Sequence, residues 1–235
     1  MNRLNEKILV IIFPFIGLIF APHAKATLAD DLKDGQHILI MRHADAPGYG
    51  DPTGYVIGQC STQRNLGDYG QKQAKAIGAW LSKQGINNAQ IFSSPWCRCL
   101  DTAQLINLGS VKIEHSLGSF FDDMSLEKKQ TKELEKFIKS ELDVQYKAPI
   151  ILVTHHVNIR AFIGKNVSQG DMVLVRLNKK GGIPVSYSLS KSKTLETELD
   201  TLSLVNINLS PERPQWMRGL SYRLGAAIWL ATSIC

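Results

Sequence analysis

The sequence predicts an α/β fold in which a mostly parallel central sheet is flanked by helices on both faces. Short apolar runs alternate along the chain with longer amphipathic segments, as in folds built from strand–helix–strand units. The run PIILVT at 149–154 is almost wholly apolar, which is typical of a central parallel strand that is buried on both faces. The composition, 44% hydrophobic and 20% charged over 235 residues, is that of an ordinary globular protein.

The first half of the predicted domain contains two strands, each followed by a helix. Each strand is a short apolar run, and each helix has apolar residues at helical spacing. Gly85 stands where the first helix would end, and Ser94-Pro95 offers a hydroxyl cap and a first-turn proline for the second helix. These criteria predict strand 37–41, a Gly- and Pro-rich loop 44–60, helix 67–84, strand 89–93 and helix 96–107.

The second half is expected to extend the same sheet. Its first helix is charged and amphipathic, and its apolar residues are expected to face inward. The apolar segment from Trp216 to Ile234 contains Arg218 and Arg223. We therefore expect an extra hairpin and a C-terminal helix packed on the domain, with a helix on a membrane surface as the alternative. These criteria predict strands 111–115, 149–154, 171–177 and 201–209 and helices 125–142 and 157–163. The residues of helix 125–142 that are expected to face inward are Leu126, Leu134, Phe137, Ile138 and Leu142.

The N-terminal segment is expected to be a cleaved signal peptide. Arg3 and Lys7 precede an apolar run at 8–20, and Ala24-Lys25-Ala26 has the small-x-small pattern of a cleavage site. The run is short for a membrane span, so an uncleaved anchor is the less favoured alternative. The predicted organisation is a signal peptide over 1–26 cut after Ala26, a folded domain over 27–190 and a C-terminal extension over 191–235. The predicted location is periplasmic or secreted.

The charge and the cysteines narrow the expected ligands. The net charge is +6, and removal of 1–26 takes away three cations and one anion, which leaves +4. No dense Lys/Arg run is present, so we expect no nucleic-acid partner. Export permits disulfides, and Cys60 could bridge to either Cys97 or Cys99. A lone CxC does not have the paired spacing of a zinc site.

Charged residues follow the ends of three predicted strands. Arg42-His43 and Thr154-His155 end two of them, and the third leads into a helix start that carries Arg98. The carboxyl ends of parallel strands gather ligands, and a helix start favours anions. Guanidinium forks match the oxygens of a phosphoryl group. The sequence therefore predicts a phosphate pocket at this edge of the sheet.

Four segments resemble motifs of the histidine phosphatase superfamily, which has the phosphoglycerate mutase-like three-layer fold. LIMRHADAP is similar to the RHG-type motif, and RNLGDYGQKQAKAIGAWL is similar to the helix that follows it. SSPWCRCLDTA is similar to SSP-x-x-R-x-x-x-TA, and ILVTHHVNI is similar to the second-histidine segment. The resemblance covers about 37–177 and follows the family order, although Ala44 stands where the family usually has glycine.

The resemblance implies a role for each motif residue. His43 would be the nucleophile, Arg42 and Arg98 the phosphate clamps, and His155 the second histidine. The family's acid is usually a glutamate after the third strand, where this chain offers Asp122 or Asp123. Further candidates are Asp45 for the acid, Arg64 as a third clamp, and His156 as a substrate contact through its backbone N–H.

These roles imply an exported phosphomonoesterase that acts through a phosphohistidine. The expected partner is a small-molecule or glycan phosphate ester, and the RHA motif also resembles exported phosphatases of lipopolysaccharide core heptose phosphates. No cofactor or metal is expected, because the arginines supply the positive charge. The alternatives are a phosphohistidine or phosphoprotein phosphatase, and a phosphate-binding module without turnover.

Overall fold

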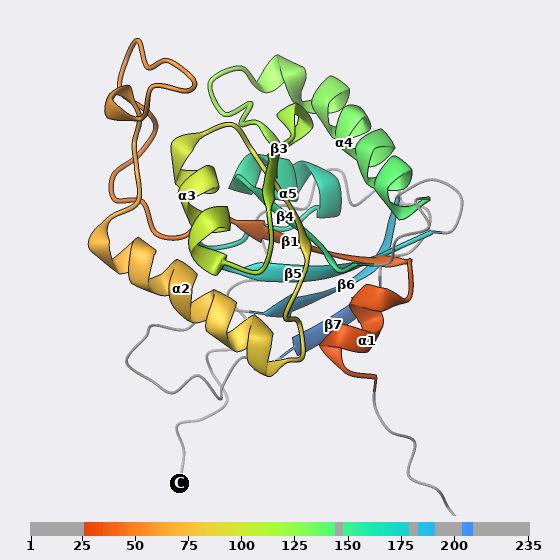
Figure 1. The fold of residues 1–235 in the computed structure, drawn as a ribbon. Coiled ribbons are helices and arrows are strands. Elements are labelled where there is room, and N and C mark those ends of the chain that lie inside the picture. Colours follow the sequence, from red (N-terminus) through yellow and green to blue (C-terminus); the bar gives the residue numbers. More distant parts are fainter. Residues whose placement is uncertain (1–25, 144–147, 179–182, 191–203, 209–235) are drawn as a thin grey trace, which may run out of the picture.

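The computed structural model of the protein describes residues 26–143, 148–178, 183–190 and 204–208 (Figure 1). Its strands form one sheet in the order β3-β2-β4-β1-β5-β6-β7. The strands are β1 (His37–Arg42), β2 (Gln90–Ser93), β3 (Val111–Ile113), β4 (Ile150–Thr154), β5 (Met172–Leu177), β6 (Pro184–Ser190) and β7 (Leu204–Asn208). The helices are α1 (Leu28–Lys33), α2 (Asp68–Lys83), α3 (Cys97–Ile106), α4 (Glu127–Leu142) and α5 (His156–Ile163), with short 3₁₀ turns η1 (Cys60–Thr62), η2 (His115–Leu117) and η3 (Met124–Leu126).

The sheet has a parallel half and an antiparallel half. Strands β3, β2, β4 and β1 pair in parallel, joined by helical crossovers. Strands β5, β6 and β7 then add antiparallel to β1 and to one another. Five of the seven strands thus run in one direction, and the predicted mostly parallel sheet is confirmed.

Helices cover both faces of the sheet, as predicted (Figure 1). Alternate residues of β1 divide the core: Leu39 and Met41 pack with α1, α2 and α3, whereas Ile38 and Ile40 pack with α4 and α5. Both sets are buried because β1 and β4 lie in the middle of three layers, which explains their nearly continuous apolar runs. Of the predicted inward residues of α4, Leu126 is instead exposed, because it lies in the 3₁₀ turn before the helix.

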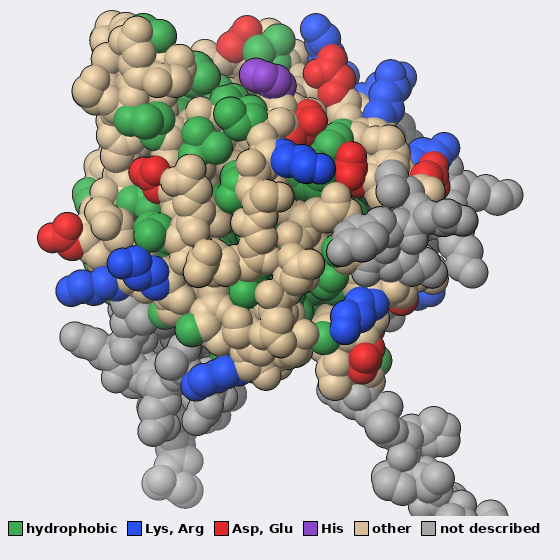
Figure 2. Space-filling view, in the orientation of Figure 1, with side chains coloured by type: hydrophobic (Ala, Val, Ile, Leu, Met, Phe, Trp, Pro, Cys, Tyr) green, Lys and Arg blue, Asp and Glu red, His purple; other side chains and the backbone are tan. Residues whose placement is uncertain are grey.

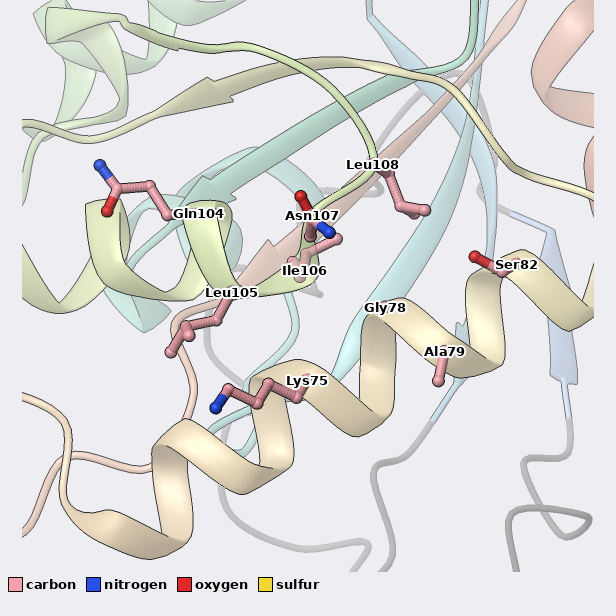
Figure 3. A pocket seen from close by; sticks show the side chains of 9 residues that line it. All are labelled: Lys75, Gly78, Ala79, Ser82, Gln104, Leu105, Ile106, Asn107 and Leu108. Carbon is pink, nitrogen blue, oxygen red and sulfur yellow. The ribbon is translucent and has the colours of Figure 1, made fainter.

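Helices α2 and α3 cross in close contact. A Cβ placed on Gly78 would lie 2.1 Å from the carbonyl oxygen of Ile106, so only glycine permits this approach. Lys75 and Ser82 on α2 and the end of α3 also line a surface hollow of about 510 Å³ (Figure 3). The hollow contains none of the predicted site residues, and it lies away from the carboxyl ends of the strands.

Three local features differ from the sequence-based expectation. Helix α1 was not expected, although Thr27 and Asp30 form a capping box at its start. No bounds were predicted for the partner strand of the expected hairpin; this strand is β6, which pairs antiparallel with the predicted strand 201–209, observed as β7, and joins it to the sheet. Ser94 was expected to cap the second helix, but α3 begins at Cys97 without a side-chain cap, because the Ser94 hydroxyl binds a histidine.

Parts of the chain lie outside the described residues. These are the predicted signal peptide up to residue 25 and the predicted C-terminal helix. Within the described ranges, no helix is both long and apolar enough to cross a bilayer.

A disulfide joins Cys60 to Cys97, one of the two predicted pairings, and Cys99 is a buried free thiol. The bridge connects η1, at the end of the long β1–α2 loop, to the first residue of α3.

Reduction, or the double substitution Cys60→Ser with Cys97→Ser, should lower the free energy of unfolding by about 2–4 kcal/mol, because the closed loop spans 37 residues. Urea unfolding with and without a thiol reductant measures this loss. The double serine variant is the control, and it should not respond to the reductant.

Candidate active site

A small pocket of about 60 Å³ opens at the carboxyl ends of the parallel strands. Of the nine candidate site residues, seven line it, whereas Asp45 and Asp123 do not. The loop from Gly48 to Asp51 and the segment from Ser119 to Asp122 form its other walls. The predicted convergence of distant chain segments on one pocket is therefore present in the structure.

The strand register brings the two histidines together. Arg42 of β1 pairs in parallel with Thr154 of β4, so the next residue on each strand is a histidine at the same edge. The backbone N–H of His43 donates to the Thr154 carbonyl at 3.0 Å. The ring centroids of His43 and His155 lie 5.6 Å apart in an edge contact. A shift of register by one residue would separate the two rings.

The His43 ring is held in one tautomer with one nitrogen free. Its side chain is 1% exposed, and Nδ1 lies 2.7 Å from the Ala44 carbonyl oxygen. A carbonyl only accepts, so Nδ1 carries the proton and Nε2 of the neutral ring keeps its lone pair. Burial lowers the pKa of His43 well below its ordinary value, and the guanidiniums of Arg98 and Arg42 lower it further, although the Ala44 hydrogen bond opposes this. His43 is therefore a neutral ring with a nucleophilic nitrogen.

Thr102 on α3 fixes the backbone beside His43. Its hydroxyl donates to the Arg98 carbonyl at 2.6 Å and accepts from the Ala44 N–H at 2.9 Å. One side chain thus connects the residue after His43 with the helix that carries Arg98. Ala44 is fully buried, which leaves little room for a larger residue at this position.

His155 is held from the side opposite the pocket. It is 2% exposed, and its Nε2 lies 2.8 Å from the Ser94 hydroxyl. The Nη2 of Arg98 lies 3.5 Å from Nδ1, and because a guanidinium only donates, Nδ1 is the acceptor. Burial lowers the pKa of His155 well below its ordinary value, and Arg98 contributes further. These shifts favour a neutral His155 ring.

Three guanidiniums surround the two rings. Arg42 donates through Nη1 to the Val167 carbonyl at 3.0 Å, and Arg64 donates through Nε to the Gly50 carbonyl at 2.9 Å and through Nη1 to Ala46. Burial and mutual repulsion lower the pKa of Arg42 and of Arg64. The Nε atoms of Arg42 and Arg98 are buried and have no hydrogen-bond partner among the described residues. Unpaired buried donors are costly, so an anion bound here would satisfy them.

Asp51, which sequence analysis did not select, is the buried carboxylate of this site. Its side chain is 5% exposed, and both of its oxygens accept from Nη1 of Arg98, at 2.8 and 3.0 Å. It also accepts from the Trp96 indole N–H at 3.2 Å and from the Arg64 backbone N–H at 2.9 Å. Its position in the Gly- and Pro-rich loop, 47 residues before Arg98, gave no sequence signal for this pairing.

The candidate acids occupy different places. Asp122 lines the pocket, and its carboxylate accepts a hydrogen bond from the Tyr55 hydroxyl at 2.9 Å. Asp123 caps η3 through the Ser125 backbone N–H and hydroxyl and does not line the pocket. Asp45 follows the nucleophile motif but is not among the pocket residues. Of the three, Asp122 has access to a bound phosphate ester.

His156 and two aromatic rings form one side of the entrance. The Phe121 ring lies 5.6 Å from the His156 ring and 5.4 Å from the Tyr49 ring, and Tyr49 is 88% exposed. His156 lines the pocket, as expected of a substrate contact. We refer to Tyr49, Phe121 and His156 as the aromatic wall.

The buried histidines predict a loss of stability in acid. Burial lowers the pKa of His156 to about 4, and His43 and His155 are shifted in the same direction. In the unfolded chain these histidines bind protons with the ordinary pKa of about 6.5, whereas in the folded protein they bind protons only at lower pH. The free energy of unfolding is therefore highest above pH ~6.5 and decreases as the pH falls below it. We expect the melting temperature to decrease as pH falls from 6.5 to 4, more gently in His156→Gln. The exposed His115→Gln is the matched control and should keep the wild-type slope.

A known family resembles this chain in sequence, and several solved structures resemble it in fold. Residues 38–125 match the family model of the histidine phosphatase superfamily (branch 1). No curated protein matches the chain. Among solved structures, the native mycobacterial glucosyl-3-phosphoglycerate phosphatase is 14% identical, with 66% of this chain and 97% of that chain covered and a TM-score of 0.50. This likeness supports the fold.

Two further solved structures are similar. A variant phosphoserine phosphatase from Entamoeba histolytica in complex with phosphoserine is 16% identical, with 68% of this chain and 98% of that chain covered and a TM-score of 0.49. The protein histidine phosphatase SixA complexed with tungstate is 18% identical, with 63% and 91% covered and a TM-score of 0.43.

The matched segment contains the nucleophile motif and all three pocket arginines. His155, which lies outside that segment, is brought beside His43 by the pairing of β1 with β4. The match to the histidine phosphatase superfamily (branch 1) over residues 38–125, together with this geometry, supports a phosphatase.

Proposed function

We propose that this phosphatase is exported and hydrolyses the phosphate ester of an envelope sugar through a phosphohistidine on His43. The proposal rests on one observation: the free Nε2 of His43 lies in a pocket lined by three guanidiniums, and the buried Nε atoms of Arg42 and Arg98 have no hydrogen-bond partner among the described residues. Such a site is complementary to a tetrahedral anion whose charge redistributes during transfer.

The reaction has two balanced steps. In the first, the His43 Nε2 lone pair attacks phosphorus, the bond from phosphorus to the ester oxygen breaks, and Asp122 gives a proton to the departing oxygen. In the second, Asp122 takes a proton from water, the water oxygen attacks phosphorus, and the bond from phosphorus to Nε2 breaks. Arg42 and Arg98 hold the oxygens throughout. The negative charge of the bound phosphoryl group favours protonation of His155, whose Nδ1 then donates to it.

A rapid chemical quench tests this mechanism. The purified protein is mixed with a ³²P-labelled phosphate ester, and the reaction is stopped with alkali, which preserves phosphohistidine. The expected result is a labelled peptide containing His43 that appears before the released alcohol reaches steady state. Turnover without a labelled peptide, even at the shortest times, would contradict the covalent mechanism.

Asp122 is testable as the acid, with its neighbour as the control. Asp122→Asn should lower kcat by roughly 10²- to 10³-fold for alkyl phosphates, whose leaving oxygen needs a proton, but by far less for p-nitrophenyl phosphate. Asp123→Asn removes the same charge from a side chain outside the pocket and should leave both activities near wild type. Steady-state kinetics on the two esters measures the difference. Equal losses on both esters would contradict the acid role of Asp122.

Two features support export and a sugar ester. The disulfide between Cys60 and Cys97 suits an oxidising compartment, in agreement with the predicted cleavage after Ala26. The aromatic wall gives the apolar face of a sugar ring a surface on which to lie, next to the Ser119 hydroxyl and the Asp122 carboxylate as hydroxyl partners. Lys and Arg are scattered among Asp and Glu on the face seen in Figure 2.

Substrate class and location need separate experiments. Cell fractionation and N-terminal sequencing would test export, and a mature chain that still begins at Met1 would contradict it. A panel of phosphorylated sugars, lipids and phosphopeptides, including a phosphohistidine peptide, would test the substrate. Sugar phosphates should give the highest kcat/KM. A preference for the phosphohistidine peptide would support the alternative phosphoprotein activity instead.

A further inference from the structure

Asp51 places a negative charge in a pocket that is otherwise suited to an anion. Asp51 lines the pocket together with His43 and the three arginines, and its carboxylate pairs with Arg98. A carboxylate in that position repels a phosphate ester, so its presence needs a physical reason. The hydrogen bonds of Arg98 provide one.

The two edges of the Arg98 guanidinium have different partners. Nη1 donates to both oxygens of Asp51 and also lies 3.4 Å from the Arg64 carbonyl. Nε has no partner among the described residues, and Nη2 has only the long 3.5 Å contact with His155. Nε and Nη2 together form the side-on edge of a guanidinium, which binds two anion oxygens at once. Asp51 therefore occupies Nη1 and leaves the side-on edge for a ligand.

Asp51 is itself fixed by two other contacts. The Trp96 indole N–H and the Arg64 backbone N–H donate to it, and the Trp96 ring packs edge-on against His155 with centroids 5.2 Å apart. Gly50, at a φ of +67°, makes the turn that leads into Asp51. One carboxylate thus connects the β1–α2 loop, the start of α3 and the second histidine.

We infer that Asp51 is a positioning residue that orients Arg98 so that its Nε–Nη2 edge faces the phosphoryl group. The inference rests on the proposed function, because the anion at that edge is taken to be the transferred phosphate. Asp51 acts through Arg98, so it differs from Asp122, which meets the leaving oxygen.

Substitution with asparagine tests the inference. The amide nitrogen of Asp51→Asn can only donate, so it opposes Arg98 Nη1 and releases the guanidinium from its orientation. We expect the inhibition constant for inorganic phosphate to rise roughly 10- to 100-fold and kcat/KM to fall by a similar factor on alkyl and p-nitrophenyl esters alike. Asp68→Asn, which removes an exposed carboxylate at the start of α2, is the charge-matched control and should leave both values unchanged.

A double-mutant cycle separates this role from a general structural one. In the Arg98→Ala background, Asp51→Asn should change the inhibition constant for phosphate by less than about threefold, because the group that it positions is absent. A loss of the same size in both backgrounds would overturn the inference. So would a wild-type inhibition constant in Asp51→Asn alone, or a loss confined to alkyl esters, which would assign Asp51 as the acid.

A charge-conserving variant covers the case in which Asp51→Asn does not fold. Asp51→Glu keeps the charge but moves the carboxylate by one methylene, so it should also weaken phosphate inhibition, and unchanged inhibition would overturn the inference. Failure of the proposed function has a different signature. Undiminished turnover by His43→Ala would contradict the function, whereas an inactive His43→Ala beside an unaffected Asp51→Asn would contradict only this inference.

Discussion

Replacement of His43 by alanine is expected to lower kcat/KM by roughly 10⁴- to 10⁶-fold, which is the largest loss that we predict for any single side chain. In the proposed mechanism the ring supplies the protein atom that bonds to phosphorus, and the guanidiniums that remain can bind the ester without transferring it. KM and the inhibition constant for phosphate should therefore change much less than kcat. Initial rates with p-nitrophenyl phosphate over a wide range of enzyme concentrations measure the residual activity.

Added imidazole provides a positive test of the same variant. The alanine leaves a space where the ring stood, and free imidazole that enters it offers an equivalent nitrogen. A small but saturable recovery of turnover, with phosphoimidazole as an intermediate, is expected. Thermal melting confirms that the variant is folded. Residual activity above about one per cent of wild type, when contaminating phosphatase has been excluded, would contradict a nucleophilic role for His43.

Several parts of the site could be predicted from the sequence because each is encoded locally. The runs before His43 and before His155 are apolar and short, which marks them as buried strands that end at charged residues. Parallel pairing of such strands brings their ends to one edge of the sheet, whichever residues come between them. The place of the two histidines thus follows from pattern and topology without detailed geometry.

Other parts could not be predicted, because they depend on contacts between distant segments. Asp51 lies in an irregular loop, and nothing near it in the sequence indicates that it meets Arg98 and Trp96. Ser94 has the pattern of a helix cap, but the nearby His155 binds its hydroxyl instead. Spacing in the sequence does not distinguish Asp122 from Asp123. The path of the chain after β3 decides that Asp122 lines the pocket and that Asp123 caps η3.

The second large effect is expected at Arg98, where a lysine cannot replace the guanidinium. The guanidinium pairs with Asp51 through Nη1 and, in the proposed site, holds the phosphoryl group through its side-on edge, whereas an ammonium is a single point charge. We expect the ammonium of Arg98→Lys to pair with Asp51 and to lose the bidentate contact with phosphate. The predicted loss in kcat/KM is roughly 10²- to 10³-fold.

Alanine at the same position should add a loss of stability to the loss of activity. Asp51 would then remain buried without its partner, which costs about 3–5 kcal/mol for a broken buried ion pair. Urea unfolding should therefore separate Arg98→Ala from Arg98→Lys, while kinetics shows both to be impaired. Arg160→Lys, on the exposed side of α5, is the matched control and should change neither quantity. Activity of Arg98→Lys within threefold of wild type would mean that a point charge at this position suffices, and the bidentate role of Arg98 would then be wrong.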